Sequence, residues 1–307
     1  MGVFMKGIVI AGPTGVGKTD LSLKLAETLG CEIISADSAQ VYKGMDIGTA
    51  KISESEMMGI KHHMLDVLEP IKKYSVGDYQ KDVDEILKNL EKENKNVILT
   101  GGTGLYINSI TDGLSDLPSA DEILRNKLSE MPIEELFEKL KELDPESAKT
   151  IHINNRKRVE RALEVCLITN QKFSELSKKN IKNNNYSFLK ICLMRDREHL
   201  YERINKRVDI MMEVGLLKEA EELFKKYGSE TLKKINIIGY SELIDYFEGR
   251  ISLEKAVDDI KKNSRHYAKR QLTWFRNQKD YIWFDLDKDS ENEILESIKN
   301  LYLKELK

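Results

Sequence analysis

Residues 7–29 read GIVIAGPTGVGKTDLSLKLAETL, and this stretch decides the fold. Its first five residues are apolar or glycine and predict a short buried strand. Leu21, Leu25 and Leu29 recur every four residues and predict a helix over residues 18–29. Between them, GPTGVGKT matches the pattern G-x-x-x-x-G-K-[ST] in full. A strand, a glycine-rich loop and a helix in this order predict a site that holds polyphosphate.

Each part of this loop has a chemical reason. Its glycines let successive backbone N–H groups turn toward phosphate oxygens, and the helix that follows adds the partial positive charge of its N-terminus. Lys18 adds a full charge, and the hydroxyl of Thr19 is a ligand for Mg²⁺. The predicted phosphate-binding residues are Gly12, Pro13, Thr14, Gly15, Val16, Gly17, Lys18 and Thr19.

The rest of the chain repeats the alternation of strand and helix. Residues 32–36 and 97–100 predict a second and a third strand, with a helical period over residues 83–90 between them. Residues 188–194 and 281–286 predict later strands of the same sheet. Such alternation indicates a parallel sheet with helices on its faces. We therefore predict an α/β fold, a P-loop NTPase-like parallel sheet flanked by helices.

Residues 116–185 interrupt this alternation, because they contain helical periods and no strand signal. They could be further helices of one domain, but strand signals resume only after them. We predict a helical insertion domain at 116–185 and a core made of residues 1–115 and 186–307. A long helix is expected from about residue 253 to residue 277, and Trp274 and Trp283 are expected to pack in the core.

Composition narrows the function classes. The 307 residues are 40% apolar and 33% charged with a net charge of −3, which is typical of a soluble globular protein and excludes a uniformly basic nucleic-acid coat. No apolar run approaches the ~20 residues of a membrane span, and the N-terminus is expected to be a strand and not a signal peptide. The three cysteines are far apart, which favours the cytoplasm.

The sequence also limits which polyphosphate could bind. No N-K-x-D loop is present, as a GTPase would need, and the third strand ends in TGGTGLY without a carboxylate. The second strand is followed by Asp37, at the edge of the sheet where ligands of open α/β folds bind. Asp37 could hold Mg²⁺ through water, act as a base, or simply cap the next segment.

Residues 35–51, SADSAQVYKGMDIGTAK, closely resemble the second block of bacterial tRNA dimethylallyltransferases, the tRNA isopentenyltransferase family. The resemblance covers nearly the whole chain. It continues through residues 62–66, 74–76, 101–106, 155–163, 239–240 and 270–275.

The resemblance implies a reaction, substrates and a location. A dimethylallyl group would pass from dimethylallyl diphosphate to N6 of the adenosine 3′-adjacent to the anticodon, position 37, in tRNAs reading UNN codons. Lys18, Thr19 and a Thr19-bound Mg²⁺ would meet the charge on the leaving diphosphate. Asp37 would take the N6 proton. The partners would be the anticodon stem-loop of tRNA and dimethylallyl diphosphate, and we expect a cytoplasmic monomer with no membrane contact.

Further residues are assigned by their match to family positions. Arg203 and Arg207, four apart on one helix, resemble basic residues near the diphosphate, although surface arginines are common on helices. The expected tRNA-binding residues are Asp37, Ser38, Ala39, Gln40, Thr103, Arg125, Lys157, Arg158, Val159, Glu160 and Arg161.

Charge patterns point to the same surface. Residues 156–190 contain nine Lys or Arg against three acids, and residues 261–279 contain seven and none, with Tyr267, Trp274 and Phe275 among them. Cations and aromatic rings together are typical of single-stranded RNA binding, although either run alone could be a solvated helix face. Residues 236–242 depart from the family pattern, so their contact with tRNA is left open.

Two other functions fit parts of the sequence. A small-molecule kinase would use the same loop with ATP as donor, but it has no evident use for the basic, aromatic helix near the C-terminus. A non-catalytic RNA-binding protein with a relict nucleotide site is the other, and the intact loop with Asp37 argues against it.

Overall fold

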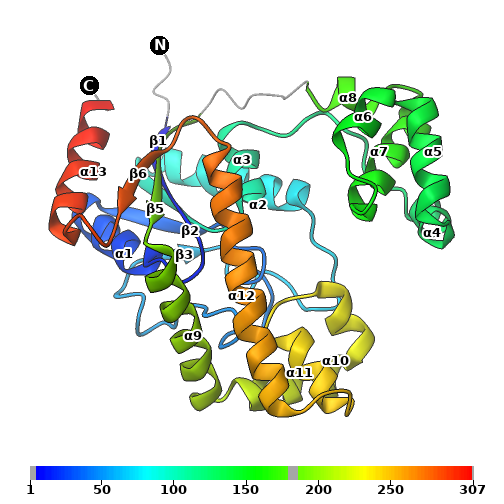
Figure 1. The fold of residues 1–307 in the computed structure, drawn as a ribbon. Coiled ribbons are helices and arrows are strands. Elements are labelled where there is room, and N and C mark those ends of the chain that lie inside the picture. The colour runs from blue at the N-terminus through cyan, green and yellow to red at the C-terminus, as the bar shows by residue number, and fades with distance from the viewer. Residues whose placement is uncertain (1–4, 179–185, 306–307) are drawn as a thin grey trace. The chain divides into compact units, whose positions relative to one another are not determined.

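The computed structural model describes residues 5–178 and 186–305. It divides into two compact units, residues 1–111 with 184–307, and residues 112–183 (Figure 1). The first unit contains the sheet, and the described elements of the second are helices. The helical insertion thus begins at residue 112, four residues before the predicted start, while the predicted end at 185 lies outside the described residues.

The first unit is built on a parallel sheet, as the sequence predicted. Its described strands follow the order β3-β2-β4-β1-β5-β6, so β1 lies inside the sheet between β4 and β5. The strands are β1 (Met5–Ala11), β2 (Cys31–Ser35), β3 (His62–His63), β4 (Asn96–Gly101), β5 (Tyr186–Met194) and β6 (Ile282–Asp285). The parallel pairing brings the carboxyl ends of these strands to one edge, where the phosphate loop follows β1.

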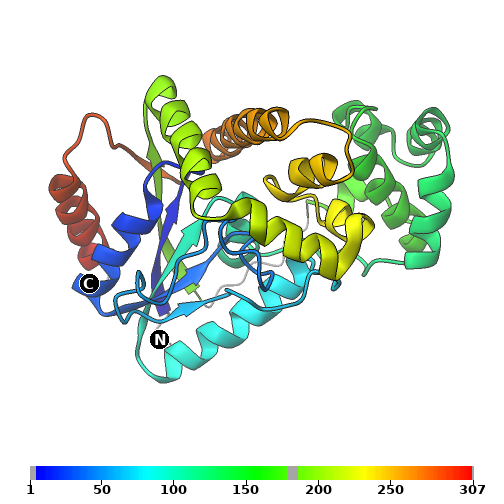
Figure 2. The same cartoon turned by 90° about the horizontal axis from the view of Figure 1, so that it is seen from below.

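Two apolar layers cover the sheet, because alternate residues of β1 point to opposite faces. Ile8 and Ile10 pack with α1 (Lys18–Leu29) and α13 (Glu291–Glu305), whereas Val9 and Ala11 pack with α2 (Val76–Lys92) and α3 (Gly104–Thr111). Figure 2 shows α1 in blue and α13 in red on one side of the strands and α2 in cyan on the other. The sheet is therefore buried on both faces, as parallel sheets require.

Four further helices form a layer with its own core beside the strand ends. They are α9 (Arg197–Glu213), α10 (Leu216–Ile235), α11 (Tyr240–Phe247) and α12 (Leu253–Arg276). The long helix α12 connects this layer to the sheet, because Ile260 packs with the helical layer while Ala268 and Phe275 pack against the two faces of the sheet (Figure 1). This path carries Tyr267 and Gln271 past the strand ends.

The insertion has a separate core. Leu136, Leu140, Val159 and Leu163 are fully buried within it. Its helices are α4 (Glu122–Glu130), α5 (Ile133–Leu143), α6 (Pro145–Thr150), α7 (Arg156–Thr169) and α8 (Phe173–Leu176). Across both units, no described helix has the length and apolar character that crossing a membrane would demand.

Candidate active site

The phosphate loop bends sharply between the end of β1 and the start of α1. Gly12 and Gly17 have φ values of 148° and 115°, conformations that L side chains rarely adopt. A Cβ on Gly12 would also lie 2.8 Å from the carbonyl oxygen of Leu193, so a side chain does not fit there. The glycines of the motif are thus needed for the path of the backbone around the site.

Lys18 reaches back over the loop that precedes it. Its Nζ donates to the carbonyl oxygens of Gly12 (3.0 Å) and Pro13 (2.8 Å). Burial lowers the pKa of Lys18 to about 8, with Asp37 acting in the opposite direction and Arg207 adding to the lowering. An anion bound in the loop would therefore stabilise the charged form of Lys18.

Three side chains from later in the chain brace the loop. Arg203 donates from Nε to the carbonyl of Gly15 (2.9 Å), which places this predicted residue beside the loop. Arg195 donates from Nε to the carbonyl of Val16 (2.9 Å). Gln271 of α12 accepts the backbone N–H of Thr14 (2.9 Å) and donates to the carbonyl of Gly102 (2.9 Å).

Sequence reasoning did not assign roles to Arg195 and Gln271. Arg195 directly follows β5, and a charged residue at a strand end is the signal that could have identified it. Gln271 is 5% exposed in the middle of a basic helix, and its only signal was membership of the quoted motif at 270–275.

Asp37 lies where the ends of β2 and β4 meet. The N–H of Ala36 donates to the carbonyl of Thr100 (2.7 Å), and the N–H of Thr103 donates to the carbonyl of Ala36 (3.1 Å). The Oδ1 of Asp37 accepts the backbone N–H of Ala39 (2.9 Å), which fixes the direction of the carboxylate. The predicted residues Asp37, Ala39 and Thr103 are thus brought together.

Ser38 belongs to the same group. Its backbone N–H donates to the Oγ1 of Thr103 (3.1 Å), and the Thr103 hydroxyl lies 3.3 Å from the Ser38 Oγ. Ser38 lines the larger cavity, where its hydroxyl can accept or donate hydrogen bonds to a substrate.

A cavity of about 480 Å³ joins the phosphate loop to Asp37. Thr14 and Arg207 line it together with Asp37. Arg207 also lines a smaller neighbouring cavity of about 80 Å³, beside Lys18 and Thr19. Burial lowers the pKa of Arg207, opposed by Asp37 and assisted by Arg203. The predicted catalytic and diphosphate-binding side chains therefore converge on one place.

The larger cavity changes character away from the phosphate loop. Its wall in the helical layer carries a group of aliphatic side chains among polar ones such as Asn263 and Ser264, and four tyrosines also line the cavity. The aliphatic residues include Ile204, Val208, Met211, Ile237, Ile238 and Ile260, and the tyrosines are Tyr42, Tyr74, Tyr106 and Tyr267. Such a lining suits an apolar chain and a flat aromatic ring.

Among the tyrosines that line the cavity, Tyr267 interacts with the charged residues Asp37 and Arg270. Burial raises the pKa of Tyr267 to about 12, and the charge of Asp37 adds to this effect. The guanidinium of Arg270 lies 5.6 Å from the centre of its ring. Tyr267 therefore stays a neutral hydrogen-bond donor beside Asp37 at ordinary pH.

The residues present fit a magnesium ion of the kind that accompanies a phosphate substrate. Thr19 and Asp37 both line the smaller cavity and offer a hydroxyl and a carboxylate oxygen. No cluster of three or more His, Cys, Asp or Glu suited to a metal occurs among residues 5–178 and 186–305. Few protein ligands are expected for Mg²⁺, which keeps several waters and takes oxygens from phosphate.

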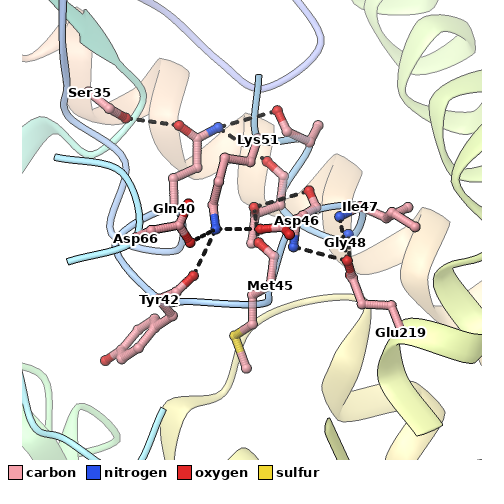
Figure 3. Close-up of polar contacts among 12 residues, drawn as sticks. Ser35, Gln40, Tyr42, Met45, Asp46, Ile47, Gly48, Lys51, Asp66 and Glu219 are labelled. Carbon is pink, nitrogen blue, oxygen red and sulfur yellow. Dashed lines mark hydrogen bonds and ion pairs between the residues drawn. The ribbon is translucent and has the colours of Figure 1, made fainter. Parts of the chain in front are cut away.

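Gln40 is held within its own segment. Its Nε2 donates to the carbonyls of Thr49 and Ala50 (3.3 Å each), and its Oε1 accepts the hydroxyl of Ser35 (2.9 Å) (Figure 3). Gln40 lines the smaller cavity, so its amide supports the wall of the site as well as being a predicted tRNA contact.

The predicted tRNA-binding residues of the insertion differ in availability. Lys157 and Arg158 are exposed on α7. Val159 has no exposed surface, so its side chain is not available to an RNA, because it packs in the core of the insertion. Glu160 accepts a hydrogen bond from Arg156 Nε (2.6 Å).

Arg125 and Arg161 already have a partner. Arg125 donates from Nε and Nη2 to Glu164 (2.8 and 3.0 Å), and Arg161 donates from Nη1 to the same carboxylate (2.6 Å). Glu164 is 1% exposed, so the two cations neutralise a buried charge. Their guanidinium groups are thus engaged inside the insertion.

Comparison with known proteins supplies the family. Residues 40–278 match the family described as IPP transferase. The chain is 58% identical over 302 residues to a tRNA dimethylallyltransferase of Fusobacterium nucleatum, covering 98% of this chain and 99% of that protein. It is 49% identical over 302 residues to a tRNA dimethylallyltransferase of Bacillus cereus, covering 96% of this chain and 94% of the relative.

Solved structures that are similar to this chain carry names of the same kind. A full-length tRNA isopentenylpyrophosphate transferase from Bacillus halodurans is 40% identical with a TM-score of 0.73, covering 99% of this chain and 97% of that one. A eukaryotic dimethylallyltransferase acting on tRNA is 27% identical with a TM-score of 0.84, covering 98% of this chain and 80% of that one.

Proposed function

Since this chain belongs to the IPP transferase family, we propose that it is an enzyme that transfers a dimethylallyl group from dimethylallyl diphosphate to tRNA. The acceptor is N6 of the adenosine 3′-adjacent to the anticodon, position 37, in tRNAs that read UNN codons. The family match and the names of the relatives favour this reaction over phosphoryl transfer by a kinase.

One observation carries the proposal. A single cavity has the phosphate loop and Asp37 at one end and, farther along, aliphatic and tyrosine side chains among polar ones such as Asn263. A five-carbon chain attached to a diphosphate needs that combination, because its leaving group is highly charged and its reacting carbon belongs to an apolar group.

The phosphate loop stabilises the leaving group. As the allylic C–O bond breaks, negative charge grows on the diphosphate, where Lys18 and the N–H groups at the start of α1 can meet it. Arg207 lines the same cavity, and Arg203 lies beside Gly15. Burial makes the charges of Lys18 and Arg207 more effective, because the low local dielectric strengthens their attraction for the diphosphate.

Asp37 is the proposed general base. The N6 amine of adenine is a weak nucleophile, since its lone pair is delocalised into the ring, and it must lose a proton as the new C–N bond forms. One oxygen of Asp37 is held by the N–H of Ala39, which leaves the other directed to accept that proton. Thr103 and Ser38, next to Asp37, can bind the base.

Thr19 would hold Mg²⁺, with Asp37 lining the same small cavity. The ion would supply positive charge to the departing diphosphate. The chain's own contribution is to place an oxygen ligand at the first turn of α1 and to leave the remaining positions to phosphate and water.

The tRNA would contact both units through exposed cations. Lys157 and Arg158 of α7 offer positive charge in the insertion, and Lys269 and Arg270 of α12 offer it beside the cavity. Trp274, 39% exposed and so outside the predicted core, provides a ring for stacking. The target adenosine must leave its stack to reach Asp37, so base flipping is part of the proposal.

The proposal includes a monomer in the cytoplasm. Cys31, Cys166 and Cys192 are buried free thiols, as expected in a reducing compartment.

The test uses purified protein, Mg²⁺, radiolabelled dimethylallyl diphosphate and tRNA that lacks the modification, beside a parallel reaction with labelled ATP. Prenyl label entering tRNA, and lost when the adenosine after the anticodon is replaced, is the expected result. Phosphate transfer from ATP without prenyl label in RNA would replace the proposal with a kinase.

A further inference from the structure

The carboxylate of Glu219, in α10, receives four hydrogen bonds. Its Oε2 accepts the backbone N–H groups of Asp46 (3.1 Å) and Ile47 (2.9 Å), and its Oε1 accepts the backbone N–H of Gly48 (3.1 Å), as Figure 3 shows. The phenol of Tyr240 donates to the same Oε1 (2.5 Å). Hydrogen bonds to an ionised carboxylate are stronger than those between neutral groups, so four donors hold the Glu219 side chain firmly in place.

The segment that Glu219 holds is also tied to the catalytic strand end. Gln40 bonds the carbonyls of Thr49 and Ala50 on one side and the hydroxyl of Ser35 on the other. Ser35 is the last residue of β2, two positions before Asp37. A displacement of residues 46–50 would therefore shift Gln40 and Ser35 and change the position of Asp37.

Lys51 fixes the same segment from within. Its side chain is 5% exposed, and its Nζ donates to the carbonyl of Tyr42 (2.8 Å) and to the carboxylates of Asp46 and Asp66 (2.6 Å each). These contacts join residues that are close in sequence (Figure 3). Glu219, in contrast, lies 171–173 residues away along the chain from the three backbone groups it binds.

Glu219 thus connects the two walls of the cavity. One wall includes Gly48 and Thr49, and the opposite wall belongs to the helical layer that contains α10. Tyr240 packs so closely on Gly48 that a Cβ there would lie 2.6 Å from its ring. We propose that Glu219 is a positioning residue for prenyl transfer, whose carboxylate fixes the wall at residues 46–49 against the helical layer. This role rests on the proposed function.

The variant Glu219→Gln tests this role, because glutamine keeps the size of the side chain but turns an NH₂ group toward N–H donors. We expect kcat for tRNA prenylation to fall roughly 10- to 100-fold, as misplacement of a site wall by about 1 Å can produce. The KM for dimethylallyl diphosphate should change little, because the phosphate loop is braced separately by Arg195 and Gln271.

Glu222→Gln is the matched control. Glu222 is exposed on the same helix, and its ion pair with Lys218 spans 3.9 Å, so the same change of charge should leave kcat unaltered. Melting temperatures of both variants are measured, and rates are compared well below them. A lowered melting temperature with wild-type kcat in Glu219→Gln would overturn the proposal, because the carboxylate would then serve stability alone.

Tyr240→Phe keeps the proposal testable if Glu219→Gln does not fold. It removes one of the four donors and retains the ring against Gly48, so a fall in kcat of roughly two- to tenfold is expected. Wild-type kcat in Tyr240→Phe would then overturn the role of Glu219. Failure of the wild-type protein to prenylate tRNA would instead overturn the proposed function from which that role follows.

Discussion

The cations of the core and those of the insertion look alike in sequence but differ in their partners. In the core, burial lowers the pKa of Lys18 and of Arg207, which means that their charges are incompletely neutralised. In the insertion, hydrogen bonding to Glu164 raises the pKa of Arg125. Burial favours the neutral form of Glu164, but the bonds from Arg125 and Arg161 lower its pKa overall.

This difference separates cations that can bind a ligand from cations that hold the fold. A buried cation whose pKa is lowered gains stability when an anion arrives, whereas a cation with a raised pKa already has its anion. The four predictions that follow test this distinction, beginning with the acid that faces the core cations.

Asp37→Ala should have the largest effect. The negative charge of Asp37 favours the charged forms of Lys18 and Arg207. As general base, Asp37 should contribute about 10²–10⁴-fold to the rate. We expect kcat to fall by that factor in single-turnover assays with saturating substrates, while tRNA binding in a filter assay stays within a few-fold.

Asp37→Asn distinguishes basicity from geometry. Asparagine can still accept the N–H of Ala39 through its oxygen, so the position of the side chain is retained while its basicity is lost. The loss of rate should therefore nearly equal that of Asp37→Ala. Turnover close to wild type in the asparagine variant would exclude Asp37 as the base.

The second prediction compares two pairs of cations in the insertion. Lys157→Gln with Arg158→Gln removes two exposed charges and should weaken tRNA binding roughly 10- to 100-fold, as the loss of two charge-assisted bonds would. The slope of log Kd against log salt should become shallower by about 1 to 2, since fewer counterions are released.

Arg125→Gln with Arg161→Gln is the matched comparison, because it removes the same charge from the same unit. It leaves the buried Glu164 without its two cations, so it should lower the melting temperature more than the exposed pair does and weaken tRNA binding less. The reverse ranking in both measurements would show that Arg125 and Arg161 are the RNA-binding pair.

Much of the fold could be predicted because its signals are local. The helix at Lys18–Leu29 has the predicted bounds, and five of the strands occur where apolar runs were found. The strand His62–His63 was missed, since two residues give no periodicity and the pairing with β2 depends on the tertiary fold. Trp274 was expected in the core, but its ring lies over Gly104 and the residue is 39% exposed.

The site was predictable only where one segment carries the chemistry. The phosphate loop and Asp37 follow strands, so the parallel sheet brings them to one edge. Glu219 and Arg195 act through backbone groups more than 170 residues away, and no local pattern marks such a contact. The sequence also did not predict that Lys157 is exposed whereas Arg161 is paired, because counting charges does not reveal that Glu164 is buried.

The third prediction concerns pH. Lys18 has a pKa of about 8, below its ordinary value, so it is charged below pH 8 and loses its charge as the pH rises further. The KM for dimethylallyl diphosphate should therefore be lowest below pH 8 and rise by up to about tenfold per pH unit above it. Lys18→Arg should give a flat KM over the same range, even if KM is higher throughout. A wild-type KM that is constant to pH 9.5 would contradict the assignment.

The smallest effect is expected at Arg195, which is paired with an acid like the cations of the insertion but also contacts the phosphate loop. Arg195 bonds Asp287 (2.6 Å) as a paired cation does, yet its Nε also donates to the carbonyl of Val16 in the phosphate loop. Arg195→Lys keeps the charge but loses the planar fork that spans both partners. We expect KM for dimethylallyl diphosphate to rise roughly two- to tenfold with kcat nearly unchanged, as the loss of one loop contact would cause.

Arg197→Lys is the control, because Arg197 is exposed at the start of α9. This substitution should leave KM and kcat as in the wild type. A fall in kcat with constant KM in Arg195→Lys would mean that Arg195 acts on the transition state and not on the shape of the loop. A rise in KM alone would mean that a cation already paired with Asp287 supports binding only by shaping the backbone, whereas Lys18 and Arg207 supply the charge that the diphosphate meets.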